Sequence, residues 1–323
     1  MKSYFTHGHA LVIGVGDYTE PGLRNLPTTR NDALALQAIL LNQDQCAYPP
    51  QQVCTLIGEE ATSTAIRTAL QQLAQASGPS ATVIIYFSGH GGQIKNAANQ
   101  TRTYLCPRDA NLHDLDATAI SREEFSVQLA AIQAKKVLVL LDCCYAADGV
   151  EIKSPDVGVL EWKAGLREVD VSQLTQGAGR VIIASSERDK PSFTNGHLSL
   201  FTQELVAGLG GAAQVGDHGC IGVLDLFNYL SQHVSAINAD QKPILHTKDL
   251  SENFPVALYR GGQKSPEPAP ATPNAPAPPA PIHTSSGTTI TNNGHIRTQT
   301  INQGTPTDDL IKLMQAAQSP PKQ

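Results

Sequence analysis

The sequence lacks a long basic run and any hydrophobic stretch long enough to span a membrane. Its 323 residues carry a formal net charge of -6, which argues against nucleic acid or an anionic membrane as the main partner. No apolar segment approaches the roughly 18 residues of a transmembrane helix. The N-terminus has too short an apolar segment, and no cleavage site, for a signal peptide. We therefore expect a cytoplasmic protein that binds neither nucleic acid nor membrane.

Metal-binding and disulfide patterns are missing as well. The cysteines show no disulfide-framework spacing and no C-x-x-C pair, and the histidines show no H-x-x-x-H pair. The six cysteines are Cys46, Cys54, Cys106, Cys143, Cys144 and Cys220. We predict reduced thiols, no metal site and no required cofactor. A nucleotide site is excluded too, because no phosphate loop is present and the third glycine of a dinucleotide fingerprint would fall at Thr19.

The sequence has instead a series of apolar runs of strand length that alternate with helical patterns. Runs without polar alternation are typical of strands buried on both faces of a parallel sheet. The expected strands are 10–15, 53–57, 83–87, 137–141, 181–184 and 254–258. The expected helices begin near Asn31 and Asp32, at Ser63, at the capping box Ser121–Glu124, and around 201–209 and 223–234. This alternation predicts an α/β fold, a mostly parallel sheet of about six strands with helices on both faces.

Three segments between these elements are predicted to be irregular. Ser88–Gly92 is glycine-rich and is interpreted as a turn at the end of a strand. Residues 93–119 are polar and loop-like. Residues 148–179 have no strong period and are interpreted as a long exposed connection.

The globular part is predicted to end near residue 260. Residues 266–281 contain eight prolines interleaved with alanine, so we expect an extended linker over 261–283. The tail, 284–323, is rich in Ser, Asn and Thr. It is interpreted either as plain disorder or as a β-forming motif that recruits a homotypic or other protein partner.

Two successive core strands lead into residues that suit thiol chemistry. His90 stands between Gly89 and Gly91 after one strand, and Cys144 follows another strand 54 residues later. Because the carboxyl ends of parallel strands are where α/β sheets bind ligands, these residues are expected at one edge. A cysteine nucleophile needs a base to form the thiolate, and neutral imidazole serves this purpose. Each residue alone would more often be structural. Cys143 is interpreted as a buried packing residue.

These residues carry a family resemblance. The run 86–91, YFSGHG, resembles the histidine motif of caspase-like cysteine peptidases in the metacaspase and orthocaspase branch, and Asp142–Cys144 resembles their D-x-C motif. Segments 10–16 and 31–32, and 184–186 with Asp189, also match positions in that family. The resemblance covers residues 8–258 and implies the caspase-hemoglobinase fold. It implies a large segment over about 1–150, an intersegment loop over 148–179 and a small segment over 180–260.

The resemblance also implies roles for individual residues. His90 would be the base, Cys144 the nucleophile, and the backbone N–H groups of Gly91 and Cys144 the oxyanion hole. Asp142 would line the S1 pocket, where a carboxylate favours Arg or Lys before the cleaved bond. Asp189 and Glu187 would add to that pocket, although an ordinary solvated turn is the alternative for both.

Some family features are expected without a motif that fixes them. Self-cleavage in the intersegment loop would use Lys153, Lys163 or Arg167. Calcium activates many metacaspases, but no recognisable calcium loop is present here. After the nucleophile the chain reads Tyr145-Ala146-Ala147, where many metacaspases have His-Ser-Gly.

The sequence as a whole favours a cysteine endopeptidase that acts on protein substrates, in cell-death or defence signalling. The alternative is a non-catalytic caspase-like scaffold that recruits partners through its tail. An intact His–Cys pair argues against the scaffold, because such scaffolds commonly lose one of the two residues.

Overall fold

The structure is a computed structural model. It describes residues 5–95, 101–144, 150–154, 158–164, 179–185, 193–194, 196–216, 219–248 and 250–259. For residues 95, 144, 150–154, 158–164 and 248 it describes the backbone but not the side chain. The predicted linker 261–283 and the tail 284–323 lie outside the described residues.

A six-strand path forms the centre of the fold, in the order β11-β9-β6-β3-β1-β2. All neighbours on this path are parallel except β11, which runs antiparallel to β9. The strands are β1 Gly8–Gly14, β2 Val53–Ile57, β3 Thr82–Lys95, β6 Lys136–Cys144, β9 Arg180–Ala184 and β11 Ile244–Lys248. The predicted α/β class with a mostly parallel sheet is therefore confirmed.

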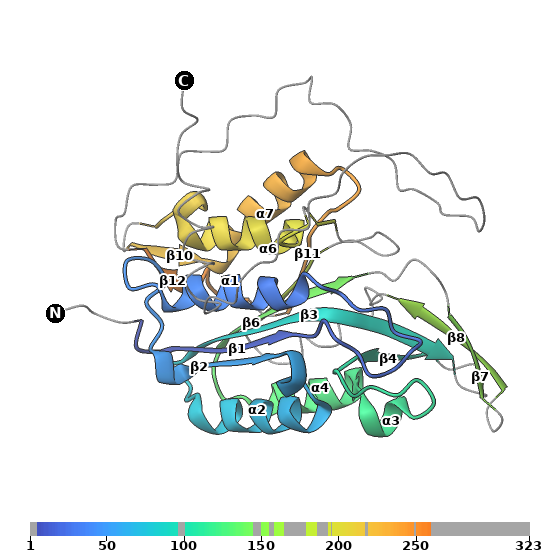
Figure 1. The fold of residues 1–323 in the computed structure, drawn as a ribbon. Helices are drawn as coiled ribbons and strands as arrows, with labels where there is room; N and C mark the ends of the chain where they lie inside the picture. The colour runs from blue at the N-terminus through green and yellow to red at the C-terminus, as the bar shows by residue number, and fades with distance from the viewer. Residues whose placement is uncertain are drawn as a thin grey trace, which may run out of the picture. The chain divides into compact units, whose positions relative to one another are not determined.

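Helices cover both faces of this sheet (Figure 1). One face carries α1 Thr29–Leu41, α6 Leu200–Ala207 and α7 Val223–Ile237. The other face carries α2 Ser63–Ala76, α4 Arg122–Ala131 and the short α3 Leu115–Thr118. Among the described helices, none is both long and apolar enough to cross a membrane.

Side chains that alternate along each central strand build two separate cores. On β3, for example, Ile84 and Tyr86 join the core under α1 and α6, whereas Val83, Ile85 and Phe87 join the core over α2 and α4. Since both faces of the strand are buried, nearly every position is apolar and no polar alternation remains. This is why the continuous apolar runs predicted the central strands correctly.

The prediction of a turn at Ser88–Gly92 is wrong, because β3 runs on through this segment to Lys95. Beyond the parallel part, β3 pairs antiparallel with β4 Thr101–Leu105 and β8 Gly158–Ala164. Backbone pairing on both sides keeps the glycines extended, which their low strand preference does not predict.

Two predicted irregular segments also contain regular structure. Residues 93–119 include β4 and α3, and β4 pairs with β5 Ile120–Ser121. Part of the expected connection 148–179 forms an antiparallel hairpin of β7 Val150–Ser154 and β8. The strand expected at 254–258 is β12 Pro255–Leu258, which pairs with β10 Cys220–Gly222 in a separate two-stranded sheet.

The remaining short elements are single turns beside β2 and after α6. They are η1 Pro50–Gln52, η2 Gly58–Glu60 and η3 Gly208–Ala212.

Helix starts agree with the sequence in two cases and differ in one. Ser121 caps α4 by accepting the Glu124 N–H at 3.1 Å, and α2 begins at Ser63 as predicted. The prediction that Asn31 or Asp32 caps a helix is wrong: α1 begins at Thr29 and Asp32 lies inside it, fully buried.

Candidate active site

The register of β3 on β6 places His90 directly beside Cys144. These two strands pair in parallel without interruption, from Thr82 with Lys136 to His90 with Cys144. Neighbouring strands lie about 4.8 Å apart, so the two backbones are within side-chain reach of each other. Both residues are at the ends of their pairing, at the carboxyl edge of the sheet. The side chain of Cys144 lies outside what the structure describes.

The imidazole of His90 is buried and held at one nitrogen. Its Nε2 lies 2.7 Å from the backbone carbonyl oxygen of Arg24, and its side chain is 0% exposed. Since a carbonyl can only accept a hydrogen bond, Nε2 must carry the proton. The neutral ring therefore keeps its lone pair on Nδ1. Among the described residues, no hydrogen-bond partner meets this Nδ1.

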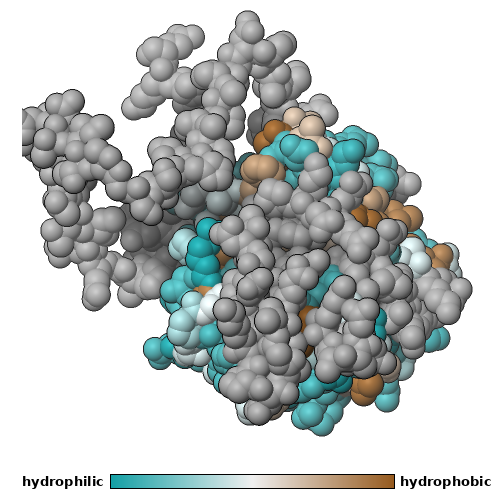
Figure 2. All heavy atoms as spheres, turned by 90° about the vertical axis from the view of Figure 1, so that its right-hand side faces the viewer, coloured by the Kyte–Doolittle hydropathy of each residue, from teal (hydrophilic) through white to brown (hydrophobic). Residues whose placement is uncertain are grey.

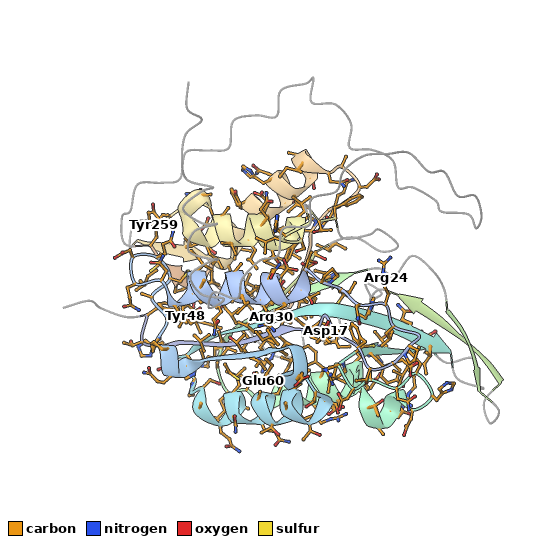
Figure 3. All side chains as sticks on the ribbon, in the orientation of Figure 1. Asp17, Arg24, Arg30, Tyr48, Glu60 and Tyr259 are labelled. Atoms are coloured by element: carbon orange, nitrogen blue, oxygen red, sulfur yellow. The ribbon has the colours of Figure 1, made fainter. Side chains whose placement is uncertain are left out.

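The surroundings of His90 keep this ring neutral. Burial is the main cause that lowers the pKa of His90 below 6.5, and the Arg24 guanidinium lowers it further, while the hydrogen bond to the Arg24 carbonyl acts in the opposite direction. Figure 3 shows Arg24 near the end of the molecule toward which β3 points. A neutral imidazole with a free Nδ1 is the form that can accept a proton.

Two buried carboxyl groups lie near this pair, one on β6 and one on α1. Asp142 on β6 and Asp32 on α1 are both 0% exposed, and Ser199 bridges them. Its backbone N–H donates to Asp32 Oδ1 at 2.8 Å and its hydroxyl donates to Asp142 Oδ2 at 2.5 Å. Ser88 Oγ donates to Asp32 Oδ2 at 3.4 Å, and Thr202 Oγ1 donates to Asp142 Oδ2 at 3.3 Å.

The proximity of Asp142 contributes to a raised pKa of Asp32. Burial is the main cause that raises the pKa of Asp32 to about 8, the charge of Asp142 is the second, and hydrogen bonds from Ser199 and Ser88 oppose both effects. The N-terminus of α6 also meets this pair, because Ser199 is the N-cap of that helix and accepts the Thr202 N–H. A helix N-terminus favours negative charge.

The structure locates the other predicted site residues as follows. Gly91 lies on β3, where it pairs with Leu105 of β4. Lys153 and Lys163 lie on the paired strands β7 and β8, with only their backbones described. Glu187, Asp189 and Arg167 lie outside the described residues.

Cys143 is buried in the apolar core over α2 and α4, as predicted. Within the described parts of the chain, no three His, Cys, Asp or Glu side chains form a group that could hold a metal ion.

The sequence-based predictions did not assign four groups to the site. Asp32 was expected only to cap a helix, although the pair Asn31–Asp32 matched the family pattern and was a usable signal. Ser199 shows the ordinary pattern of an N-cap. The Arg24 carbonyl and the Tyr18 hydroxyl, which accepts the His90 N–H at 2.7 Å, have no local sequence signal.

The face at the carboxyl edge of the sheet is turned to the viewer in Figure 2. Among the described residues visible there, hydrophilic ones prevail and hydrophobic ones form separate small groups.

Comparison with known proteins gives one family and one fold. The family model described as "Caspase domain" matches residues 7–255. No curated protein matches the sequence. A protein from Geobacter sulfurreducens with a solved crystal structure is similar in fold, with 16% identity and a TM-score of 0.54, over 78% of this chain and 98% of that one.

Two insect caspase structures are also similar, at lower scores. Caspase-1 from Spodoptera frugiperda has 16% identity and a TM-score of 0.48, over 80% of this chain and 94% of that one. A structure described as pro-sf-caspase-1 has 14% identity and a TM-score of 0.47, over 79% and 96%.

Proposed function

The chain belongs to the caspase-domain family, and from this premise we propose that it is a cysteine endopeptidase in which His90 activates Cys144. The observation that carries the proposal is the pairing of His90 with Cys144 across β3 and β6. No described residue forms a hydrogen bond with Nδ1 of His90, which supports the proposal because a base needs a free lone pair near the thiol. Protein substrates are implied by the family.

The proposed reaction begins with proton transfer from the Cys144 thiol to Nδ1 of His90. The thiolate attacks the scissile carbonyl carbon, and the N–H groups of Gly91 and Cys144 stabilise the oxyanion. The imidazolium then gives its proton to the leaving amine as the C–N bond breaks. Water, deprotonated by His90, hydrolyses the thioester and restores the thiol. The Arg24 carbonyl keeps the Nε2 proton in place and thereby fixes Nδ1 as the reacting nitrogen.

We further propose that Asp142 and Asp32 form the base of the S1 pocket and select Arg or Lys before the cleaved bond. Both side chains are buried, and Ser199 joins them. Because Asp32 keeps its proton at neutral pH, the negative charge of the pair would be that of Asp142. A charge-assisted hydrogen bond contributes about 1.5–3 kcal/mol. Loss of one should lower kcat/KM for an Arg substrate by roughly 10- to 150-fold. Glu187 and Asp189 remain proposed contributors to the pocket.

The test is hydrolysis of a fluorogenic peptide panel with Arg, Lys, Gln or Asp at that position, with and without calcium. We expect cleavage after Arg and Lys that Cys144→Ala abolishes and Asp142→Asn reduces selectively. Asp44→Asn is the control, because Asp44 is exposed. Cleavage after Asp would agree with Cys144 as the nucleophile but would refute the proposed acidic S1 pocket. No cleavage under any condition would favour the non-catalytic scaffold.

Of the three candidate self-cleavage sites, we propose Arg167 as the preferred one. Lys153 pairs with Val159 and Lys163 with Gln93, and a peptide bond inside a paired strand must leave its ladder before it can enter an active site. The last described residue of β8, Ala164, pairs with Gly92, close to His90. Mass spectrometry of the purified protein, compared with Arg167→Ala and Lys163→Ala, distinguishes the sites. Cleavage that persists in Arg167→Ala would reject the preference.

The cytoplasmic location, the cell-death or defence pathway, and partner recruitment through 284–323 are proposed on the family resemblance and the composition of the tail. Deletion of residues 261–323 tests whether the tail recruits partners. If the tail only recruits partners, the deletion should leave peptide hydrolysis unchanged and abolish association with partners in a pull-down.

A further inference from the structure

The loop that follows β1 holds His90 at two points. The hydroxyl of Tyr18 accepts the backbone N–H of His90 at 2.7 Å, and the carbonyl of Arg24 accepts the proton of Nε2 at 2.7 Å. The Tyr18 ring also packs against the imidazole, with centroids 4.8 Å apart and planes tilted by 41°. The loop thus contacts the backbone, the ring face and the ring tip of one residue.

The Tyr18 hydroxyl takes the place of a missing strand partner. β1 pairs with β3 as far as Gly14 with Ser88, and the Val15 N–H then donates to the Ser88 carbonyl at 2.8 Å. Because polar groups alternate along a strand, the His90 N–H faces the same side as that carbonyl. The β1–β3 ladder has ended at this point. The Tyr18 hydroxyl accepts this N–H and donates its own proton to the Val15 carbonyl at 3.3 Å.

Hydrogen bonds fix the loop itself and thereby the position of Tyr18. The Tyr18 N–H donates to Asn25 Oδ1 at 2.9 Å, and the Thr19 N–H donates to the Arg108 carbonyl at 3.0 Å. A fixed hydroxyl and a fixed ring restrict both the His90 backbone and the rotation of its side chain.

We propose that Tyr18 is a positioning residue for His90: its hydroxyl completes the β3 ladder, and its ring holds the imidazole with Nδ1 toward Cys144. This inference rests on the proposed peptidase function, in which Nδ1 takes the thiol proton. Tyr18 contacts neither the substrate nor the reacting atoms in this account. It acts only through the orientation of His90.

The test uses Tyr18→Phe, which removes the hydroxyl and keeps the ring. Tyr48→Phe is the matched control, because the Tyr48 hydroxyl is also buried on a backbone carbonyl, that of Val256, and lies at the opposite end of the molecule from Arg24 (Figure 3). Tyr18→Phe loses two hydroxyl hydrogen bonds and Tyr48→Phe loses one, so both variants should lose stability.

Only Tyr18→Phe should lower kcat, by about 10- to 100-fold as expected for a misplaced catalytic group, with KM changed less than threefold. A kcat for Tyr18→Phe within twofold of that for Tyr48→Phe overturns the proposal.

A spectroscopic readout separates this inference from the peptidase proposal. The ¹⁵N shifts of the neutral His90 ring report which nitrogen carries the proton, whether or not any peptide is cleaved. We expect one Nε2–H tautomer in the parent and in Tyr48→Phe, and a mixture of tautomers in Tyr18→Phe. If no variant cleaves peptide, the peptidase proposal fails, but the tautomer of His90 still tests the role of Tyr18. An unchanged tautomer in Tyr18→Phe would reject that role.

If Tyr18→Phe does not fold, Asn25→Ala is the substitute variant, because Asn25 is exposed. It removes the side chain that holds the Tyr18 N–H. A smaller loss of kcat with a partial tautomer change supports the proposal, and no change in either readout rejects it.

Discussion

Replacing Asp32 by Asn should change how the stability of the domain depends on pH. Asp32 is fully buried, and its burial together with the nearby Asp142 raises its pKa from 3.8 to about 8. Asn has nearly the same shape and can still accept the Ser199 N–H that now binds Oδ1. The substitution therefore removes the titration while it preserves this contact.

The sign and size follow from proton linkage. Between pH 4 and pH 8 the folded protein keeps a proton on Asp32 that the unfolded chain has released, so the free energy of unfolding falls as pH rises. One proton corresponds to about 1.36 kcal/mol per pH unit. From pH 5 to pH 7 this group should lower the free energy of unfolding by up to about 2.5 kcal/mol. For a domain of this size that equals about 5–10 °C in Tm.

The assay is urea unfolding at pH 5, 6 and 7 of the parent, Asp32→Asn and Asp44→Asn. Asp44 serves as the control because its side chain is exposed, whereas that of Asp32 is buried. We expect the pH slope to flatten in Asp32→Asn alone. Asp142→Asn should flatten it partly, because it removes the charge that raises the Asp32 pKa. Equal slopes in the parent and Asp32→Asn would refute a protonated Asp32 at neutral pH.

Two further predictions concern a glycine and the base. Gly179→Ala should destabilise the domain by roughly 3 kcal/mol or more in urea unfolding, because φ is +71° and a Cβ would lie 1.7 Å from the Lys135 carbonyl oxygen. Gly78→Ala, where no atom lies within 4 Å, should change stability little, and equal effects at the two sites would contradict this account. If the peptidase proposal holds, kcat/KM should fall on the acid side with a midpoint below 6.5, because burial lowers the pKa of His90 and only the neutral ring accepts a proton. Arg24→Gln keeps the backbone carbonyl and removes the guanidinium that lowers this pKa, so its midpoint should move upward; an unmoved midpoint would exclude that influence.

The sequence predicts the parts of this fold that rest on local pattern. Apolar runs identify β1, β3, β6 and β9, because a strand buried on both faces has no polar positions. The same pattern does not identify β11, whose sequence ILHTK is mixed. It also assigns Ser88–Gly92 to a turn, although pairing on both sides of β3 holds these residues extended.

The candidate site also contains residues that the sequence predicts and residues that it does not. His90 and Cys144 are predictable, because each follows an apolar run and their strands are neighbours. The bridge from Ser199 to Asp142 and Asp32 is not, because it joins residues 57 and 167 positions apart. The Arg24 carbonyl is a backbone atom, so no residue type at position 24 signals its role.

The uninterrupted pairing of β3 with β6 limits how this chain can change in length. Every pair from Thr82 with Lys136 to His90 with Cys144 keeps the same spacing along the sequence. A residue inserted inside either strand would shift the pairs beyond it by one place and turn their side chains to the opposite face. His90 would then face away from its present neighbours.

Insertions between the two strands have no such effect, because a longer connection costs little closure entropy. Length variation among related chains should therefore occur between 96 and 135, in the connections outside β4, α3, β5 and α4. The segments 82–90 and 136–144 should remain free of insertions and deletions.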